Sequence, residues 1–228
     1  MSWGAGIAGV SSRSMARNRG NKKGATGRRR DVSAPSFWEQ LYNRGKTGWD
    51  LGQPTPVLKK WLSGHRGKGE KVCILGAGNG YDAVAFAKAG YDVVAVDFAP
   101  TPLRYLSDLA HKSKLPIEVV AQDMFYLPKK WNGRFDLIFE YTTYCAIDPR
   151  RRNEYVALIK RLLNQQGRLV ALFFPMDQDP TVGPPYGVSY DEIAQRFGRH
   201  FIIASEEWPE LSVASRRLRE LFVVMDRR

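Results

Sequence analysis

The stretch LGAGNGYD, residues 75–82, places a glycine at every second position. Residues 71–76, KVCILG, lead into it with the continuous apolar pattern of a buried strand. Residues 81–90, YDAVAFAKAG, follow it with the alanine-rich pattern of a helix that ends at Gly90. A strand, a glycine turn and a helix in this order bring free backbone N–H groups to the carboxyl edge of a sheet. The stretch therefore predicts a ligand site at that edge.

Helices and strands alternate along the rest of the chain. Further strands are predicted at 91–97, 117–123, 135–140, 167–174, 201–208 and 220–226. Helices are predicted at 36–45, with Ser36 as its N-cap, and at 56–64, 101–112, 149–164 and 189–198. Near-continuous apolar strands that alternate with helices are typical of an α/β fold with a doubly wound, mostly parallel sheet. The last two strands have no clear helix between them, so we expect an antiparallel C-terminal edge pair in a seven-stranded sheet.

Two classes of cofactor bind at such a glycine turn, dinucleotides and S-adenosylmethionine. The dinucleotide fingerprint G-x-G-x-x-G requires glycine at position 81, which is Tyr81 here. The chain instead has the G-x-G-x-G spacing of adenosylmethionine-dependent methyltransferases, at Gly76, Gly78 and Gly80. Asp97 ends the next strand, where a carboxylate accepts hydrogen bonds from ribose hydroxyls. Asp123 ends the third strand, where the adenine amino group would lie.

The composition argues against several classes of protein. The 228 residues are 43% hydrophobic, which is enough for one globular domain with a full core. No apolar run approaches the ~18–20 residues that a membrane span needs. Cys73 and Cys145 form no CxxC motif and have no metal-ligand spacing, so we expect neither a disulfide scaffold nor a metal site. This cysteine usage fits a reducing compartment, and we expect a cytoplasmic location.

Positive charge is concentrated at the N-terminus. Residues 1–34 contain eight Lys or Arg residues and one acid, Asp31, so they carry +7 of the net charge of +12. The segment is rich in Gly, Ser and Asn, and we expect a disordered tail in front of a single domain at 35–228. Three roles stay open for this tail: a transit peptide, a tether to nucleic acid or anionic membrane, or a solvated extension.

Four stretches together resemble the thiopurine methyltransferase-like family, which includes bacterial and plant thiol, thiocyanate and halide methyltransferases. They are FWEQLYNRGKTGWDLGQPTPVL (37–58), LGAGNGYDAVAFAKAGYDVVAVDFAP (75–100), FDLIFEYTTYCAIDP (135–149) and GPPYGVS (183–189). The resemblance runs from about Phe37 to the C-terminus. It implies a Rossmann-like class I methyltransferase fold with S-adenosyl-L-methionine as the cofactor.

The resemblance also implies a set of cofactor contacts, to which we add Tyr42, Gly78 and Gly80. The implied residues are Trp38, Trp49, Gly76, Asp97, Asp123, Met124 and Glu140. Adenosylmethionine is a sulfonium cation, and an aromatic face attracts a cation by roughly 0.5–2 kcal/mol. The two tryptophans are either ordinary packing residues or a cover over the cofactor. The Gly- and Pro-rich sequence of 45–56 favours the mobile cover.

The sequence departs from related enzymes at three positions. Tyr42 stands where family members often have another tryptophan, and Ile74 is apolar where many methyltransferases have an acid in the first strand. Tyr141 stands where thiopurine methyltransferases proper have an arginine that meets a substrate carboxylate. The resemblance therefore favours small neutral thiols or small anions over thiopurine carboxylates.

The stretch after the fourth strand, EYTTYCAIDP at 140–149, is expected to face the transferred methyl group, and it contains no His or Lys. A thiol of pKa ~8.5 is already partly ionised at pH 7, and thiocyanate or iodide needs no deprotonation. The reaction then needs positioning and exclusion of water rather than a strong base. Tyr141 and Tyr144 are the candidate catalytic residues, because their hydroxyls can orient the nucleophile.

These observations predict transfer of the methyl group of adenosylmethionine to a small soft nucleophile, in the first place a thiol, by in-line displacement. A halide or thiocyanate methyltransferase is the alternative with the same chemistry. A nucleic-acid methyltransferase guided by the basic tail is a further alternative. It is disfavoured because 140–149 lacks the [D/N/S]-P-P-[Y/F/W] motif of enzymes that methylate DNA amines. We expect a monomer that acts on a small molecule and not at a membrane.

Overall fold

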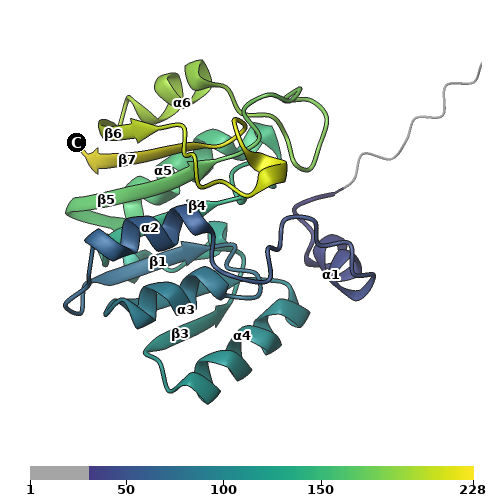
Figure 1. Cartoon of the computed structure of the whole chain (residues 1–228), viewed down its shortest axis with the longest axis vertical. Coiled ribbons are helices and arrows are strands. Elements are labelled where there is room, and N and C mark those ends of the chain that lie inside the picture. The colour runs from purple at the N-terminus through teal and green to yellow at the C-terminus, as the bar shows by residue number, and fades with distance from the viewer. Residues whose placement is uncertain (1–30) are drawn as a thin grey trace, which may run out of the picture. The chain divides into compact units, whose positions relative to one another are not determined.

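The computed structural model describes residues 31–228 (Figure 1). Of the predicted basic tail, all but residues 31–34 lies outside the described residues. These four residues lead into the first helix, and Val32 among them is buried, with 6% of its surface exposed. The described part of the chain thus includes a packed residue that precedes the predicted domain start at residue 35.

Seven strands form one mixed sheet within residues 31–228. They are β1 (Lys71–Leu75), β2 (Asp92–Asp97), β3 (Ile117–Ala121), β4 (Phe135–Tyr141), β5 (Leu163–Phe173), β6 (Phe201–Glu207) and β7 (Leu221–Arg227). Their order is β3-β2-β1-β4-β5-β7-β6; the first five are parallel, and β7 runs antiparallel to β5 and β6. The predicted fold is confirmed. The strand order reverses between β1 and β4, where a crevice opens at the carboxyl ends of the strands.

Helices cover both faces of this sheet (Figure 1). The covering helices are α2 (Pro56–Gly64), α3 (Tyr81–Lys88), α4 (Pro100–Ser113), α5 (Arg152–Leu162) and α6 (Tyr190–Phe197). A further helix, α1 (Pro35–Asn43), lies beyond the ends of the strands. Leu58 of α2, Phe86 of α3 and Leu106 of α4 belong to one apolar core cluster. Tyr155 of α5 and Phe197 of α6 belong to a second cluster, which explains why the central strands β1, β2 and β4 are buried over most of their length.

Two helix starts show how local sequence sets the element boundaries. The prediction that Ser36 caps the first helix is wrong, because α1 begins at Pro35, after Ala34, without a side-chain cap. Proline suits this position since its fixed φ angle is helical and its missing N–H is not needed there. In α6, by contrast, Oγ of Ser189 accepts a hydrogen bond from the Glu192 N–H at 3.1 Å, as the capping box predicts.

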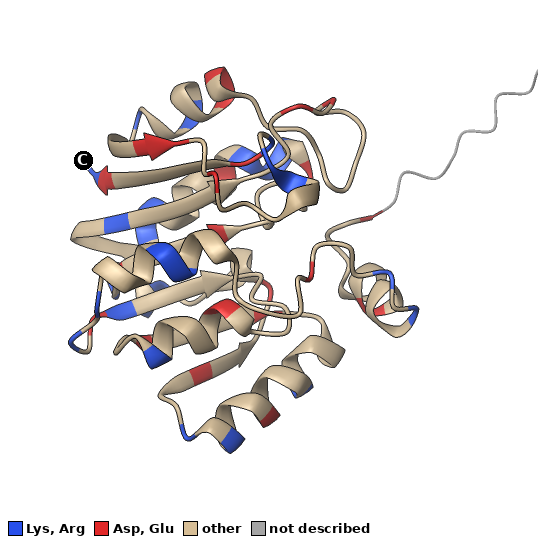
Figure 2. Cartoon of the chain, viewed as in Figure 1, with Lys and Arg blue, Asp and Glu red and all other residues tan. Residues whose placement is uncertain are grey.

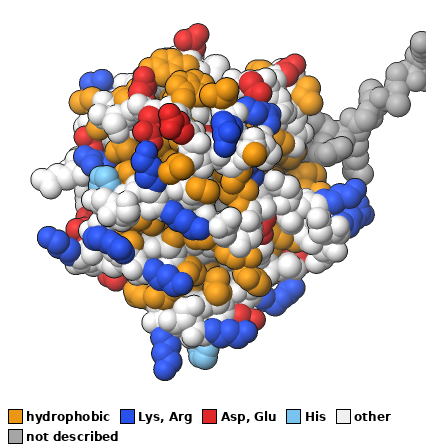
Figure 3. Space-filling view, in the orientation of Figure 1, with side chains coloured by type: hydrophobic (Ala, Val, Ile, Leu, Met, Phe, Trp, Pro, Cys, Tyr) orange, Lys and Arg blue, Asp and Glu red, His pale blue; other side chains and the backbone are white. Residues whose placement is uncertain are grey.

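Charged side chains are dispersed over the elements of the described domain (Figure 2). Residues 1–30 account for eight of the twelve net positive charges, so residues 31–228 carry a net charge of +4. On the face drawn in Figure 3, Lys and Arg stand among acidic and apolar side chains. None of the helices within 31–228 has the length and the apolar character needed to cross a membrane.

Candidate active site

The glycine turn has a backbone geometry that requires glycine. Gly76, Gly78 and Gly80 have positive φ angles of 66°, 53° and 78°. A β-carbon on Gly76 would lie 2.6 Å from Oγ1 of Thr143, and one on Gly80 would lie 2.1 Å from a δ-carbon of Leu106. Backbone conformation and internal packing therefore both exclude side chains at these two positions, before any cofactor is considered.

Asp97 holds the glycine turn in place from the end of β2. Its Oδ2 accepts a hydrogen bond from the Gly78 N–H at 2.8 Å. Its Oδ1 accepts hydrogen bonds from the N–H groups of Phe98 and Ala99, at 2.7 and 2.9 Å. Burial raises the pKa of this carboxyl, and the three hydrogen bonds oppose the rise. Because Oδ2 accepts a single bond from the described residues, it can accept a second one from a ribose hydroxyl.

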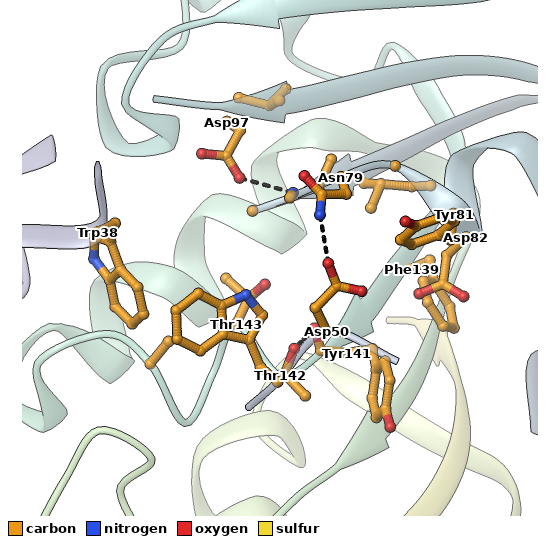
Figure 4. Close-up of a pocket in the computed structure, with 18 of the residues that line it drawn as sticks. Trp38, Asp50, Asn79, Tyr81, Asp82, Asp97, Phe139, Tyr141, Thr142 and Thr143 are labelled. Atoms are coloured by element: carbon orange, nitrogen blue, oxygen red, sulfur yellow. Dashed lines mark hydrogen bonds between the residues drawn. The ribbon is translucent and has the colours of Figure 1, made fainter. Parts of the chain in front are cut away.

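A pocket opens beside this turn, at the carboxyl ends of β1, β2 and β4 (Figure 4). Its wall combines the glycine turn, the end of β4, residues of α1 and the loop that joins α1 to α2. Nine of the predicted site residues line it: Trp38, Tyr42, Trp49, Gly76, Gly78, Gly80, Asp97, Met124 and Tyr141. The fold thus brings together side chains that are about 100 residues apart in the sequence.

Three aromatic residues meet at the pocket. The rings of Trp38 and Trp49 pack edge to face with centroids 5.3 Å apart, and those of Tyr42 and Trp49 do so at 5.4 Å. Nε1 of Trp49 donates a hydrogen bond to the Tyr42 hydroxyl at 3.2 Å, and Nε1 of Trp38 donates to the Val32 carbonyl at 2.8 Å. Burial raises the pKa of Tyr42 far above its usual value, so its hydroxyl is neutral. The cluster supplies the aromatic surface that a sulfonium cation favours.

Asp123 is one of three predicted site residues that do not line the pocket. Its Oδ1 accepts a hydrogen bond from the Phe125 N–H at 2.9 Å and caps the short 3-10 helix η1 (Met124–Tyr126). Its two sequence neighbours, Gln122 and Met124, do line the pocket. The segment at the end of β3 therefore lines the pocket through the two neighbours of Asp123 and not through Asp123 itself.

Glu140 and Tyr144 lie away from the pocket as well. Successive side chains of a strand point to opposite faces, so Phe139 and Tyr141 line the pocket while Glu140 points into the second core cluster. There Glu140 accepts hydrogen bonds from the Tyr155 hydroxyl and, at 2.8 Å, from the Tyr144 N–H. Burial raises the pKa of Glu140 to about 7. These hydrogen bonds hold the turn after β4 in place from the core side of the sheet.

The structure does not bring the Tyr144 hydroxyl to the pocket. Its side chain is 1% exposed and packs against Phe173 and Phe197, with ring centroids 5.6 and 5.5 Å away. The hydroxyl donates a hydrogen bond to Oε1 of Glu192 at 3.1 Å. A tyrosine in this environment supports the fold and has no free hydroxyl for a nucleophile.

Sequence reasoning missed several polar residues that line the pocket, among them Asp50, Asn79 and Asp82 (Figure 4). Asp50 accepts a hydrogen bond from the Asn79 side-chain amide through Oδ2 and from the Gly52 N–H through Oδ1, at 2.7 Å. Asp82 lies in the first turn of α3 and accepts from the Thr55 N–H at 3.0 Å. Burial raises the pKa of Asp82 to about 7. Asp82 could have been predicted from the sequence, because it is the last residue of the glycine stretch at 75–82. No sequence motif indicates Asp50.

An arginine from the C-terminal part of the chain reaches the end of the pocket at Tyr141. Arg216, in the 3-10 helix η4 (Ala214–Arg216), donates through Nη1 to the Tyr141 hydroxyl. Its Nη2 donates to the Trp49 carbonyl at 2.8 Å. The Tyr141 hydroxyl in turn donates to Oε1 of Glu220 at 2.8 Å. No sequence pattern indicated this network, because 75 residues separate Arg216 from Tyr141.

The side chains of this pocket fit a cationic nucleoside. Three carboxylates line it, those of Asp50, Asp82 and Asp97, and within residues 31–228 no Lys, Arg or His does. Asp97 offers an acceptor to a ribose, and the aromatic cluster offers ring surface to a sulfonium group. In the same part of the chain, no group of three His, Cys, Asp or Glu residues is arranged to hold a metal ion.

Comparisons with known proteins agree with this site. Residues 33–225 match the thiopurine S-methyltransferase family. "Probable thiol methyltransferase 2" of Arabidopsis thaliana is 35% identical over 68% of this chain and 68% of its own length. Thiocyanate methyltransferase 1 of Brassica oleracea is 31% identical over 80% of this chain and 81% of its own length.

A solved structure shares the fold at lower identity. The 1,6-didemethyltoxoflavin-N1-methyltransferase of Burkholderia thailandensis superposes with a TM-score of 0.69 at 21% identity, over 86% of this chain and 88% of that one. Its crystals contain S-adenosylhomocysteine, the demethylated form of the cofactor. The family match covers almost the whole described domain. The chain belongs to the thiopurine S-methyltransferase family and is an S-adenosylmethionine-dependent methyltransferase.

Proposed function

We propose that this enzyme methylates a small soft nucleophile and that a thiol is its principal substrate. The observation that carries the proposal is the end of the pocket at Tyr141. The one cation that reaches this end, Arg216 within the described residues, is already engaged by Tyr141, Glu220 and the Trp49 carbonyl. A substrate carboxylate would have to compete with these partners, whereas a small neutral thiol does not. The thiol and thiocyanate methyltransferases among the relatives support this substrate class.

The chemistry follows from the charges at the site. Adenosylmethionine supplies a methyl group on a positively charged sulfur. The thiolate sulfur forms a bond to the methyl carbon, the bond from that carbon to the sulfonium sulfur breaks, and its electron pair neutralises the sulfonium. We propose that Tyr141 orients the nucleophile by contact with its ring, because its hydroxyl proton is already donated to Glu220. The Trp38 and Trp49 rings exclude water from the nucleophile. Tyr144 then acts through packing and not by contact with the substrate.

A thiocyanate or halide substrate is the second candidate. Thiocyanate methyltransferase 1 of Brassica oleracea is 31% identical and covers most of this chain. Such anions need no base, and no Lys or His lines the pocket within residues 31–228. The same site therefore serves both substrate classes, and relative turnover distinguishes them.

We further propose that the enzyme works as a monomer in a reducing compartment such as the cytoplasm. Both cysteines are free and buried, and burial raises the pKa of the Cys145 thiol to about 12, which keeps it protonated and unreactive. The dispersed charges of the described domain give little support to a nucleic-acid substrate. Light scattering after gel filtration tests the monomer: a mass near 25.8 kDa is expected, and twice that mass contradicts it.

The function is tested with methyl-labelled adenosylmethionine and a panel of acceptors. The panel holds sulfide, a small neutral thiol, a thiol carboxylate, thiocyanate, iodide, and pools of RNA and DNA. We expect kcat/KM to be highest for the neutral thiol or sulfide. Preference for thiocyanate or iodide moves the assignment to the second candidate. Labelling of nucleic acid alone overturns the proposal.

A further inference from the structure

The charged side chains that line the pocket within residues 31–228 are all acidic. Asp50, Asp82 and Asp97 line it, with no cationic side chain among the lining residues of the described domain. Adenosylmethionine carries two positive groups, the sulfonium and the α-ammonium of its amino-acid part. The aromatic cluster suits the sulfonium. The ammonium group, a donor of three hydrogen bonds, needs an oxygen acceptor, and an anionic one is the strongest.

Two of the three aspartates are already engaged by the protein. Both oxygens of Asp97 accept backbone hydrogen bonds that hold the glycine turn, and its place at the end of β2 suits the ribose. Each oxygen of Asp50 also accepts one hydrogen bond, from the Asn79 amide and the Gly52 N–H, so a further bond to Asp50 would share an oxygen with one of these donors. The first strand offers no acid either, because Ile74 is the residue of β1 that lines the pocket.

Asp82 differs from both. One oxygen, Oδ1, accepts from the Thr55 N–H at 3.0 Å, and no described residue donates a hydrogen bond to Oδ2. Asp82 is partly buried, and in Figure 4 it lies to the right of Asp50, whereas Asp97 lies to the upper left. The charged groups around it are Arg216 from η4, Lys59 from α2 and Asp50 from the loop. Neither Arg216 nor Lys59 forms an ion pair with Asp82, because neither places a side-chain nitrogen within 4 Å of its oxygens.

The direction of the cofactor places its amino-acid part toward this residue. The pocket extends from Asp97 along the glycine turn, which joins β1 to α3, so a cofactor with its ribose at Asp97 can extend along this turn. Asp82 is the second residue of α3, just beyond the turn. We propose that Oδ2 of Asp82 accepts a hydrogen bond from the α-ammonium group of adenosylmethionine and is the main anionic partner of that group. Asp82 is thereby a cofactor-binding residue in addition to a support for Thr55.

Binding must then depend on the protonation of Asp82. Burial raises the pKa of this carboxyl to about 7 in the free protein, while the ammonium group favours the ionised form. Below pH 7 a proton has to leave Asp82 when the ammonium binds. Proton release is therefore a consequence of the proposal that can be measured without turnover.

The test compares two ligands by calorimetry on the full chain. S-adenosylhomocysteine has the ammonium group, and 5′-methylthioadenosine keeps adenine, ribose and sulfur but lacks the amino-acid part. We expect Asp82→Asn to weaken adenosylhomocysteine about 10- to 100-fold at pH 8, the range for a hydrogen bond between charged groups. The affinity for methylthioadenosine should stay within two-fold. Retained methylthioadenosine binding also shows that the variant is folded, since the Asn oxygen can still accept from Thr55.

Asp108→Asn is the matched control, because it removes the same negative charge from an exposed residue of α4. It should leave the affinities for both ligands unaltered. At pH 6.5, titrations in buffers of different ionisation enthalpy should show proton release for the wild type and none for Asp82→Asn. An equal loss of affinity for both ligands overturns the proposal, because Asp82 would then act by holding the loop at Thr55. Unchanged adenosylhomocysteine affinity with a lowered kcat for a thiol also overturns it and makes Asp82 a candidate base.

Discussion

Nη2 of Arg216 donates a hydrogen bond to the carbonyl oxygen of Trp49 at 2.8 Å, across 167 residues of sequence. The same guanidinium donates to the Tyr141 hydroxyl. Trp49 belongs to the aromatic cluster, and Tyr141 ends the strand that leads to the proposed substrate end. One buried side chain therefore sets the position of the aromatic cluster relative to the end of β4.

Loss of Arg216 should destabilise the fold strongly. Arg216 and Glu220 are 4% and 1% exposed, so Arg216→Ala leaves a buried carboxylate without its cation. We expect the free energy of unfolding in urea to fall by about 3 kcal/mol. Arg219→Ala breaks the exposed pair with Asp177 and should cost less than about 1 kcal/mol. Equal losses for the two variants would show that the buried pair contributes nothing beyond an exposed one.

Asp97 should be required for cofactor binding. Asp97→Ala removes the proposed ribose acceptor and the acceptor of the Gly78 N–H. The affinity for adenosylhomocysteine should therefore fall by ~1.5–3 kcal/mol or more. Asp92→Ala, at the exposed start of the same strand, is the control and should bind normally. Calorimetric affinity that is unchanged in Asp97→Ala removes this residue from the site.

Tyr141→Phe tests whether the enzyme ionises its substrate. Burial raises the pKa of Tyr141 far above its usual value, so the hydroxyl does not act as a base near neutral pH. We expect kcat/KM for a thiol to fall about ten-fold, as for one neutral hydrogen bond, and not by the ~10²–10⁴ of a lost general base.

The pH profile gives the second half of this test. For a thiol, kcat/KM in the wild type should rise with pH up to about the pKa of the thiol itself. For thiocyanate or iodide the profile should be almost flat above pH 7.5, where Asp82 is ionised. A thousand-fold loss in Tyr141→Phe, or a steep profile for iodide in that range, would mean that the protein supplies base catalysis.

Shortened proteins should locate the functional N-terminal boundary. A protein that begins at Asp31 should keep the turnover rate of the full chain with a small thiol. One that begins at Pro35 lacks Val32, which is buried and whose carbonyl accepts from Nε1 of Trp38 at 2.8 Å. This second protein should bind adenosylhomocysteine about ten-fold more weakly, as for one hydrogen bond. Inactivity of the first protein while it is still folded would place the basic segment in the active site.

Stability should fall as the pH rises from 5 to 7.5. Burial raises the pKa values of Glu140 and Asp82 to about 7, above the ~4 of an unfolded carboxyl. The folded protein then binds more protons than the unfolded chain, so alkali favours unfolding until the pH passes 7. Between pH 5 and 7.5 the free energy of unfolding should therefore fall by about 2 kcal/mol less in Glu140→Gln than in the wild type. Glu118→Gln, an exposed control, should follow the wild type, and identical slopes for both variants would contradict the expectation.

The sequence by itself determined the fold and the class of cofactor. Apolar strands and the glycine stretch were sufficient for the doubly wound sheet, because strand burial and turn geometry depend on residues close together in the chain. For the same reason the spacing between the glycine turn and the next strand singled out Gly76 and Asp97, which both line the pocket. The structure then gave the glycines an additional reason: a β-carbon on Gly80 would meet Leu106.

Tertiary structure decided which side chains of a correct segment reach the pocket. Glu140 and Tyr144 lie in the stretch that the sequence singled out, but strand alternation and core packing turn both toward the opposite face. Asp50, Arg216 and Glu220 reach the pocket region from loops and a short helix far along the chain. Their positions depend on long-range hydrogen bonds such as that from Arg216 to Trp49. Sequence periodicity carries no information on such contacts, because it reports only which side of its own element a residue occupies.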